Sequence, residues 1–489
     1  MISSTTARPA FRVIDGSGPR PGHRIEVPVP DAPRVSAPEL AAEMAEIFAL
    51  SLLRKCSLAD LHDPHCAVWV DGTTRFTLHE LLCEMRSLAW YDSSRALPGR
   101  DTLSEEAEHR RALRWNADGQ LTLRTLFRCG VALRGEVGLS SLWRSDHAVS
   151  KPDPVRRPPR DDAPMSAWLD WCERHSGAGL RLPGQPMRRP HVGTLEAMSE
   201  DLHRMPAARP FYNAVLAALA RGAALDQGLV GSGFSWRGNR LMSLMAEAET
   251  RACRAILSQT HAADRLPRPA VTSARMTVWL AREERGSGGD TALYRTAAEE
   301  LAEAAPNLLY WVSRANKALG QGAARFGGGL FLPLVEPQGH ALNPADCATH
   351  MAVAGALATL LKAVFDTSRR TQLQPVGVFG PGVALGEEAD RMVSNIALSR
   401  VVSGGYHPAE NVQQMRLGQS IALQILREAL EADNRSAVLS LNDFDGRELR
   451  LEAHPRVFGR GFAELRADGA AISWPQEAAP PAAHLTAVV

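Results

Sequence analysis

The run His350-Met-Ala-Val-Ala-Gly-Ala-Leu-Ala-Thr-Leu-Leu-Lys-Ala-Val-Phe365 decides the fold class, because it is a long apolar segment of good helix formers. Ala, Leu and Met dominate further segments with helical periodicity, and alternation of β-branched residues is rare. These further segments cover about 195–262, 291–320, 386–402 and 410–432. The sequence therefore predicts a mainly helical protein.

Signals for helix starts, turns and strands divide the rest of the chain. Ser36-Ala-Pro-Glu39 predicts a capping box, in which Ser36 and Glu39 bind each other's backbone amides at the start of an apolar helix. Two strand-like runs flank the turn former Asn442-Asp-Phe-Asp-Gly446, which predicts a β-hairpin over 437–452. We expect one helical domain over 36–476, an irregular arm over 1–35, a Pro- and Arg-rich surface loop over 151–164 and a flexible tail over 477–489.

The composition excludes several classes of protein. Fifty-five Lys and Arg balance 54 Asp and Glu, which gives no electrostatic case for nucleic acid or an acidic membrane surface. No run reaches the roughly 18 uninterrupted apolar residues that a membrane span needs. The seven cysteines are odd in number and lack metal-ligand spacing, which indicates free thiols in a reducing compartment. We expect a cytoplasmic protein with a small-molecule partner, no nucleic acid and no membrane span.

Three segments far apart in the chain carry the candidate site. They are Gln259-Thr260-His261-Ala-Ala-Asp264-Arg265-Leu-Pro-Arg268-Pro269, Asp346-Cys-Ala-Thr-His350 and Arg400-Val-Val-Ser-Gly-Gly-Tyr406-His407-Pro-Ala-Glu410. Together they resemble the oxyanion-binding segments of the vanadium-dependent haloperoxidases, a superfamily that shares its anion pocket with acid phosphatases of the PAP2 type. Stretches over 39–54, 123–130, 241–251, 392–400 and 416–422 are similar to further parts of that superfamily in the same order, and the last two resemble its bacterial and algal bromoperoxidase-like branch.

This resemblance implies a fold and a set of site residues. The implied fold is all-α, with two four-helix bundles around one pocket, a small C-terminal β-hairpin and assembly as a homodimer. Arg268 and Arg400 match the arginines that clamp the oxyanion, and His350 matches the acid–base histidine. Thr260 stands where the family has a lysine, and Thr349 stands where it has a glycine.

The position of the family's vanadium-binding histidine is occupied by Tyr406. In the family, vanadium(V) needs that imidazole for its coordination, and a phenol with an unperturbed pKa near 10 is a costly replacement at neutral pH. We therefore expect vanadate binding to be lost. A shift of one residue would instead bring His407 into the pocket, although Pro408 and Glu410 match the family only with Tyr406 at the ligand position.

Three functions are open for such a protein. The first is an enzyme of specialised metabolism that works without vanadate, in which the arginines hold a substrate phosphate or diphosphate and His350 and Tyr406 transfer a proton. By resemblance its substrate is a terpenoid or prenyl diphosphate, with Mg²⁺ as a cofactor and Glu249 and Asp264 as speculative ligands. The second is an atypical vanadium-dependent bromoperoxidase, which oxidises halide with hydrogen peroxide. The third is a non-catalytic ligand-binding protein. A phosphatase is disfavoured, because Tyr406 replaces its nucleophilic histidine.

Overall fold

The computed structural model describes residues 27–94, 97, 104–131, 138–144, 192–230, 236, 238–259, 266–280, 289–318, 329–332, 348–371, 373 and 382–475. The predicted surface loop and C-terminal tail lie outside these residues, as does most of the predicted N-terminal arm. Among the helices described, none combines the length and the apolar character that crossing a membrane requires.

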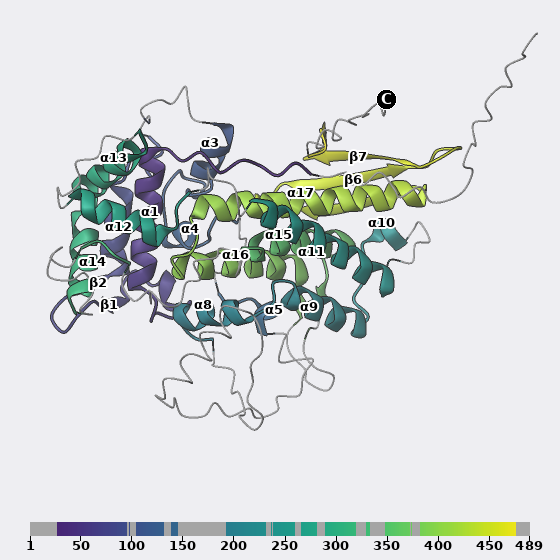
Figure 1. The fold of residues 1–489 in the computed structure, drawn as a ribbon. Helices are drawn as coiled ribbons and strands as arrows, with labels where there is room; N and C mark the ends of the chain where they lie inside the picture. The colour runs from purple at the N-terminus through teal and green to yellow at the C-terminus, as the bar shows by residue number, and fades with distance from the viewer. Residues whose placement is uncertain are drawn as a thin grey trace, which may run out of the picture.

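A group of four long helices forms the centre of the molecule (Figure 1). These helices are α11 (Asn239–Gln259), α15 (His350–Val364), α16 (Leu385–Val402) and α17 (Pro408–Asp433). Every residue of α15 is buried, as expected for its apolar sequence. Shorter helices cover the lower side of the group in Figure 1: α5 (Ser141–Arg144), α8 (Leu195–Arg204) and α9 (Arg209–Ala220).

The closest contact in this group joins the backbones of α15 and α17. A Cβ atom added to Gly355 would lie 2.3 Å from the carbonyl oxygen of Met415, and one added to Gly418 would lie 2.1 Å from that of Ala352. No side chain fits between the two helices at these points. The two glycines therefore allow a separation that any larger residue would increase.

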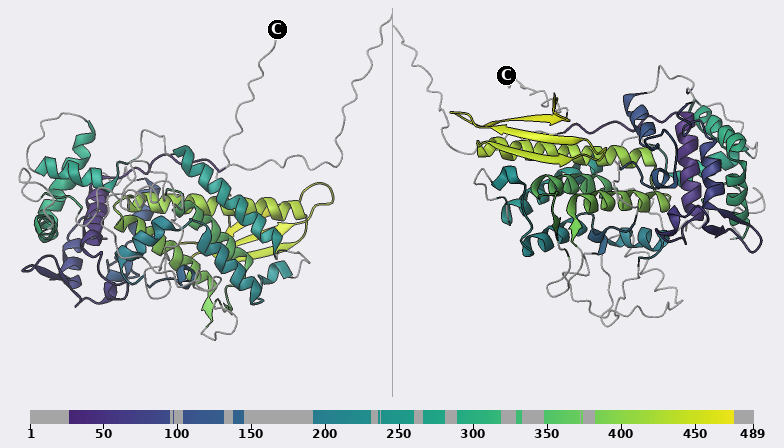
Figure 2. Two further views of the ribbon diagram at one scale, coloured as in Figure 1. Left: turned by 60° about the horizontal axis from the view of Figure 1, so that its bottom comes forward. Right: turned by 180° about the vertical axis from the view of Figure 1, so that it is seen from behind.

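A second group of four helices packs beside the first. Its members are α1 (Ala37–Leu52), α12 (Pro269–Leu280), α13 (Gly289–Ala304) and α14 (Pro306–Ala318). The second group lies at the left in Figure 1 and at the right in the back view of Figure 2. Helix α1 contacts α13 and α14 within its own group and α16 in the first group. The predicted all-α architecture of two four-helix bundles is confirmed.

Helix α1 also corrects one prediction. The Ser36 hydroxyl accepts the backbone N–H of Glu39 at 3.4 Å, so Ser36 caps the helix as predicted. The Glu39 carboxylate does not complete a capping box. It pairs instead with Arg110 of α3 (Glu105–Ala112), through N–O distances of 2.6 and 2.9 Å. A buried bidentate ion pair with the guanidinium replaces the local bond to the helix terminus.

Two predicted helical spans are divided. The span over 195–262 breaks after α8 and again at Gly222, whose φ of +68° ends α9, so that α11 starts only at Asn239. The span over 291–320 is divided between α13 and α14 at Ala305, ahead of Pro306. The remaining short elements are η1 (Asp60–His62), β1 (Ala67–Trp69), β2 (Arg75–Thr77), α2 (Leu78–Arg86), α4 (Leu123–Leu126), α10 (Gln227–Val230), β3 (Arg370–Thr371) and β4 (Val383–Ala384).

The C-terminal hairpin belongs to a larger sheet than predicted. Strands β5 (Ala437–Asn442) and β6 (Glu448–His454) pair as expected, and β7 (Phe462–Ala467) and β8 (Ala470–Ile472) extend the sheet in the antiparallel order β5-β6-β7-β8. Both views of Figure 2 show this sheet lying along α17. One face of β5 to β7 is buried against α15 and α17. The added strands are rich in Ala, Glu and Arg, which do not favour strands, so the sequence gives little sign of them.

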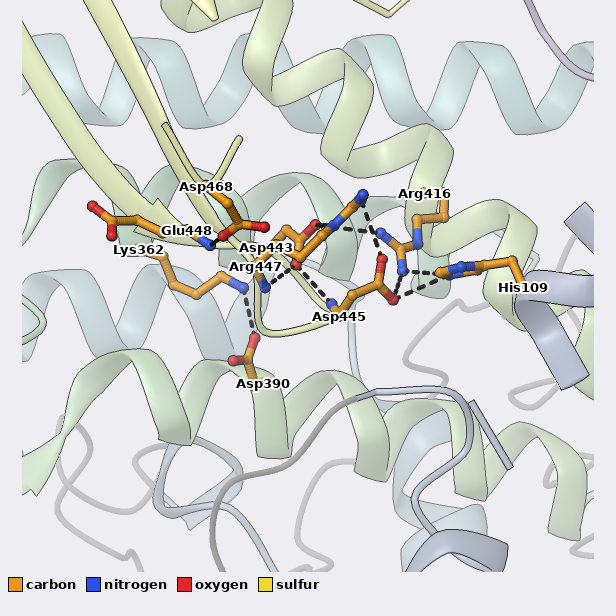
Figure 3. Close-up of polar contacts among 9 residues, drawn as sticks. All are labelled: His109, Lys362, Asp390, Arg416, Asp443, Asp445, Arg447, Glu448 and Asp468. Carbon is orange, nitrogen blue, oxygen red and sulfur yellow. Dashed lines mark hydrogen bonds and ion pairs between the residues drawn. The ribbon is translucent and has the colours of Figure 1, made fainter. Parts of the chain in front are cut away.

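A charged cluster holds the β5–β6 turn against the helices (Figure 3). The Asp443 carboxylate accepts the backbone N–H groups of Asp445 and Arg447 at 2.9 and 2.8 Å, which confirms the predicted turn-forming role. The Asp445 carboxylate accepts hydrogen bonds from His109 of α3, at 3.1 Å, and from Arg416 of α17. The turn is therefore tied to two helices that are remote in sequence.

The next residue of the turn, Phe444, contacts a buried lysine. The Lys362 ammonium of α15 lies 4.0 Å from the centroid of the Phe444 ring and 2.7 Å from the Asp390 carboxylate of α16. Lys362 is only 2% exposed, so both contacts stabilise a charge that water cannot reach.

Candidate functional site

The third sequence segment forms the connection between α16 and α17. Arg400 lies in the last turn of α16 and is completely buried. Its guanidinium carbon lies 3.7 Å from the centroid of the Tyr406 ring. Gly404, with a φ of +68°, allows the chain to turn back between the two residues. The tyrosine ring therefore covers one face of the guanidinium in a cation–π contact.

His407, the residue after Tyr406, is also completely buried. Its Nδ1 lies 3.1 Å from Oε2 of Glu43 on α1, and its Nε2 lies 3.1 Å from the carbonyl oxygen of Pro267. Burial alone would lower the pKa of His407, but the hydrogen bond and the negative charge of Glu43 outweigh it and raise the pKa above its ordinary value. Both ring nitrogens thus contact groups of the protein itself.

The end of the first segment, from residue 266 onwards, lies beside the third. Arg268 is half-buried and directly precedes α12, and its carbonyl oxygen accepts the N–H groups of Val271 and Thr272 at 2.8 and 3.0 Å. The contact between His407 and the Pro267 carbonyl brings the residue before Arg268 against the residue after Tyr406. The predicted positions Thr260 and Asp264 lie outside the described residues.

The second segment starts α15. His350 is the first residue of this helix and is 7% exposed. Its Nε2 lies 2.7 Å from the carbonyl oxygen of Met205, just after α8. A carbonyl oxygen only accepts, so Nε2 carries the proton of this bond and Nδ1 is the basic nitrogen of the neutral ring.

Polar residues of α9 and α11 surround the start of α15. The Thr349 hydroxyl hydrogen-bonds with the Cys253 thiol of α11, whose pKa is raised by burial. Glu249, one turn earlier in α11, hydrogen-bonds with Tyr212 of α9, and burial together with this carboxylate raises the Tyr212 pKa to about 12. Thr349 and Glu249 therefore both contact neighbouring side chains.

Arg400 contacts Tyr406 directly, and the contact between His407 and Pro267 brings the chain next to Arg268 close to this pair. His350 lies on α15, which packs against the two helices that carry or follow Arg400 and Tyr406. Convergence of His350 with both arginines on a single anion stays a prediction. Sequence reasoning missed Glu43 as a contact of the site. The available signal was a set of three glutamates, at 39, 43 and 46, on one face of an otherwise apolar helix.

Of the two predicted Mg²⁺ ligands, Asp264 lies outside the described residues and Glu249 lies within them. Within that part of the chain, the only group of metal-binding side chains with suitable spacing is Glu452, His454 and Glu464, on β6 and β7. Arg466 lies 3.3 Å from a carboxylate oxygen of each glutamate, so an arginine already neutralises them. Glu249 is not part of this group, and Mg²⁺ binding stays a prediction.

Comparison with known proteins finds similarity in sequence and similarity in fold. No protein-family model matches the sequence. The chain is 22% identical over 481 residues to the vanadium-dependent bromoperoxidase of Corallina pilulifera, covering 87% of this chain and 76% of that protein. It is also 22% identical over 485 residues to that of Corallina officinalis, with the same coverage. Its fold is similar to the homohexameric vanadate-dependent bromoperoxidase of Ascophyllum nodosum, with a TM-score of 0.57 and 15% identity over 91% of this chain and 75% of that one.

Proposed function

Since the chain belongs to the vanadium-dependent haloperoxidase superfamily, we propose that it is an enzyme of this fold that works without vanadate. One observation carries the proposal. Tyr406 holds the position at which the resembling motif has its metal-binding histidine, and its ring is stacked at 3.7 Å on the buried Arg400 guanidinium. By this resemblance, a phenol stands where the family places an imidazole.

The donor set of these residues does not suit vanadate. A phenol with an ordinary pKa near 10 is protonated at neutral pH and coordinates poorly in that form. The adjacent imidazole of His407 is bonded at Nδ1 to Glu43 and at Nε2 to Pro267, and to ligate a metal it would have to give up one of these contacts. Loss of one buried hydrogen bond to a charged group costs about 1.5–3 kcal/mol.

The remaining groups suit a substrate oxyanion. Arg268 and Arg400 each present a planar fork that matches a phosphate group. With Nε2–H of His350 donated to Met205, its Nδ1 is the atom that would take or return a proton, and the Tyr406 hydroxyl is a second candidate. We propose a phosphorylated small molecule as the substrate class, and an isoprenoid diphosphate with Mg²⁺ as the first to test.

An atypical vanadium-dependent bromoperoxidase is the second candidate. The extended likeness to two vanadium-dependent bromoperoxidases favours it. Arg268, His350 and Arg400, which match the motif that the sequence resembles, favour it too. A non-catalytic protein that binds an anion in the same pocket is the third. The two experiments below separate the three.

The first experiment measures vanadate binding by equilibrium dialysis, and bromination of a phenolic substrate with bromide and hydrogen peroxide. We expect the wild-type protein to brominate at background level. The double variant Tyr406→His with Thr260→Lys is expected to bind vanadate at least about tenfold more tightly, because it restores an imidazole and a positive charge. Vanadate-dependent bromination by the wild-type protein, well above background, would establish the second candidate and refute the first.

The second experiment measures release of inorganic diphosphate from isoprenoid diphosphates in the presence of Mg²⁺. Turnover by the wild-type protein that falls at least about tenfold in Arg268→Gln supports the proposed enzyme, because one anion contact is removed without changing the buried Arg400. Binding of the diphosphate without turnover in either protein would support the third candidate.

A further inference from the structure

We infer that His407 and Glu43 are positioning residues that hold the Arg268 segment against the Arg400–Tyr406 turn. The geometry of this inference comes from the contacts in the structure, and its consequence for anion binding rests on the proposed function. Both ring nitrogens of His407 and both carboxylate oxygens of Glu43 contact other groups of the protein. The two residues act through the backbone on either side of the pocket.

The hydrogen bonds form one continuous buried chain. Glu43 is 2% exposed, and its Oε1 accepts the backbone N–H of Ala409 at 2.6 Å while its Oε2 accepts His407 Nδ1–H at 3.1 Å. On its other side His407 donates Nε2–H to the carbonyl of Pro267 at 3.1 Å. This series of hydrogen bonds thus runs from α1, through the first turn of α17, to the residue that precedes Arg268.

The chemistry of the partners fixes the protonation of the ring. A carboxylate and a carbonyl oxygen both accept hydrogen bonds and neither donates. Because His407 contacts one of each, an ionised Glu43 requires a proton on both ring nitrogens, which makes the ring an imidazolium. A neutral ring has one N–H and would lose either Glu43 or Pro267.

Charged groups around His407 support a buried imidazolium. On α1 the two neighbouring carboxylates have their own guanidinium partners, since Glu39 pairs with Arg110 at 2.6 Å and Glu46 pairs with Arg114 at 2.9 Å. Glu43 therefore faces His407 as its own counter-ion. On α17, Glu410 accepts the backbone N–H of His407 at 3.3 Å.

Two site residues adjoin, through one peptide bond each, the residues that form this series of hydrogen bonds. Pro267 adjoins Arg268, and His407 adjoins Tyr406, whose ring lies on Arg400. Neighbouring Cα atoms are separated by about 3.8 Å, so a shift of the imidazolium moves both arginine-bearing segments. A displacement of about 1 Å in a preorganised site can reduce function by about a hundredfold.

The matched variants are Glu43→Gln, Glu43→Leu and His407→Phe. A glutamine at 43 can accept the Ala409 N–H with its oxygen and donate its amide to Nδ1 of a neutral His407, which still donates Nε2–H to Pro267. Glu43→Gln therefore keeps the whole chain of hydrogen bonds without charge. Leucine and phenylalanine keep apolar volume but break the chain.

The first readout is ¹⁵N NMR of the His407 ring at neutral pH. We expect two protonated nitrogens in the wild-type protein and one, at Nε2, in Glu43→Gln. A wild-type ring without a proton at Nε2 could not donate to the Pro267 carbonyl and would overturn the inference.

The second readout is hydrogen–deuterium exchange of a peptide covering 266–272, without any ligand. Exchange should rise at least about tenfold in Glu43→Leu and His407→Phe, in proportion to the open population, and stay near wild type in Glu43→Gln. If Glu43→Gln loosens this peptide as much as Glu43→Leu, or if no variant loosens it, positioning by this hydrogen-bond chain is refuted.

The third readout is binding of inorganic phosphate by calorimetry. We expect an affinity loss of at least about tenfold in the two chain-breaking variants and little change in Glu43→Gln. A wild-type protein that binds no phosphate, but shows the expected NMR and exchange results, would sink the proposed anion pocket and leave the positioning geometry intact. Unchanged phosphate affinity in all variants would refute the positioning role.

Discussion

At the scale of single residues, the contact between Arg400 and Tyr406 predicts a measurable effect on stability. In Tyr406→Leu the buried guanidinium loses an aromatic face, and we expect the free energy of unfolding to fall by about 1–2 kcal/mol. Tyr406→Phe keeps the ring and is expected to stay within about 0.5 kcal/mol of wild type. Urea denaturation of the three proteins provides the measurement. Equal losses in the two variants would mean that the hydroxyl, and not the ring, makes the important contact.

Sequence reasoning at this scale could identify residues but not their partners. Arg268, Arg400 and Tyr406 were found because a motif fixes their spacing along the chain. The partnership of Glu43 with His407 could not be found in the same way, since 364 positions separate the two residues. A local pattern carries no information on which of several buried glutamates a distant imidazole will meet.

At the scale of secondary-structure elements, the glycines between α15 and α17 predict a strong effect of one methyl group. In Gly418→Ala the new Cβ would lie 2.1 Å from the Ala352 carbonyl oxygen, so the helices must separate, and we expect a loss of about 2–3 kcal/mol in unfolding free energy. Gly386→Ala is the matched control in α16, because its Cβ would meet side chains and no backbone, with Thr367 at 3.2 Å and Lys362 at 3.8 Å. Chemical denaturation that gives the same stability for both variants would contradict the close backbone contact.

The elements themselves were predictable to different degrees. The apolar run of α15 and the periodic sequences of α16 and α17 determine helices almost by themselves, and their bounds agree with the expectation within about two residues. Strands β7 and β8 were missed because Ala, Glu and Arg dominate them and their order depends on pairing with β6. The breaks in the long span over 195–262 depend on tertiary packing, which periodicity does not report.

At the scale of the whole molecule, the β5–β6 turn predicts how stability depends on pH. Burial acts to raise the pKa of Asp445, but the hydrogen bond from His109 and the charge of Arg416 lower it to about 2. The pKa in the folded protein is thus below that in the unfolded chain. The ionised Asp445 carboxylate therefore makes its full contribution to the free energy of unfolding above about pH 4. That contribution is lost as the pH falls from about 4 to about 2.

We expect Asp445→Asn to reduce the unfolding free energy at neutral pH by at most about 2 kcal/mol, and the difference from wild type to vanish near pH 2. Glu464→Gln, which removes a partly exposed partner of Arg466 on the same sheet, should cost less than about 1 kcal/mol. Urea denaturation over a pH series provides both values. A difference between Asp445→Asn and wild type that persists unchanged at low pH would refute the assignment.

The three buried glutamates of α1 have a consequence during protein synthesis. Glu43 meets His407 across 364 positions, whereas Glu39 meets Arg110 across only 71. Helix α1 therefore leaves the ribosome long before its last ionic partner has been made. While it waits, its carboxylates are hydrated and reduce the apolar surface that the nascent chain exposes. The glutamates that the folded protein buries would thus keep α1 hydrated until the C-terminal third of the chain has been synthesised.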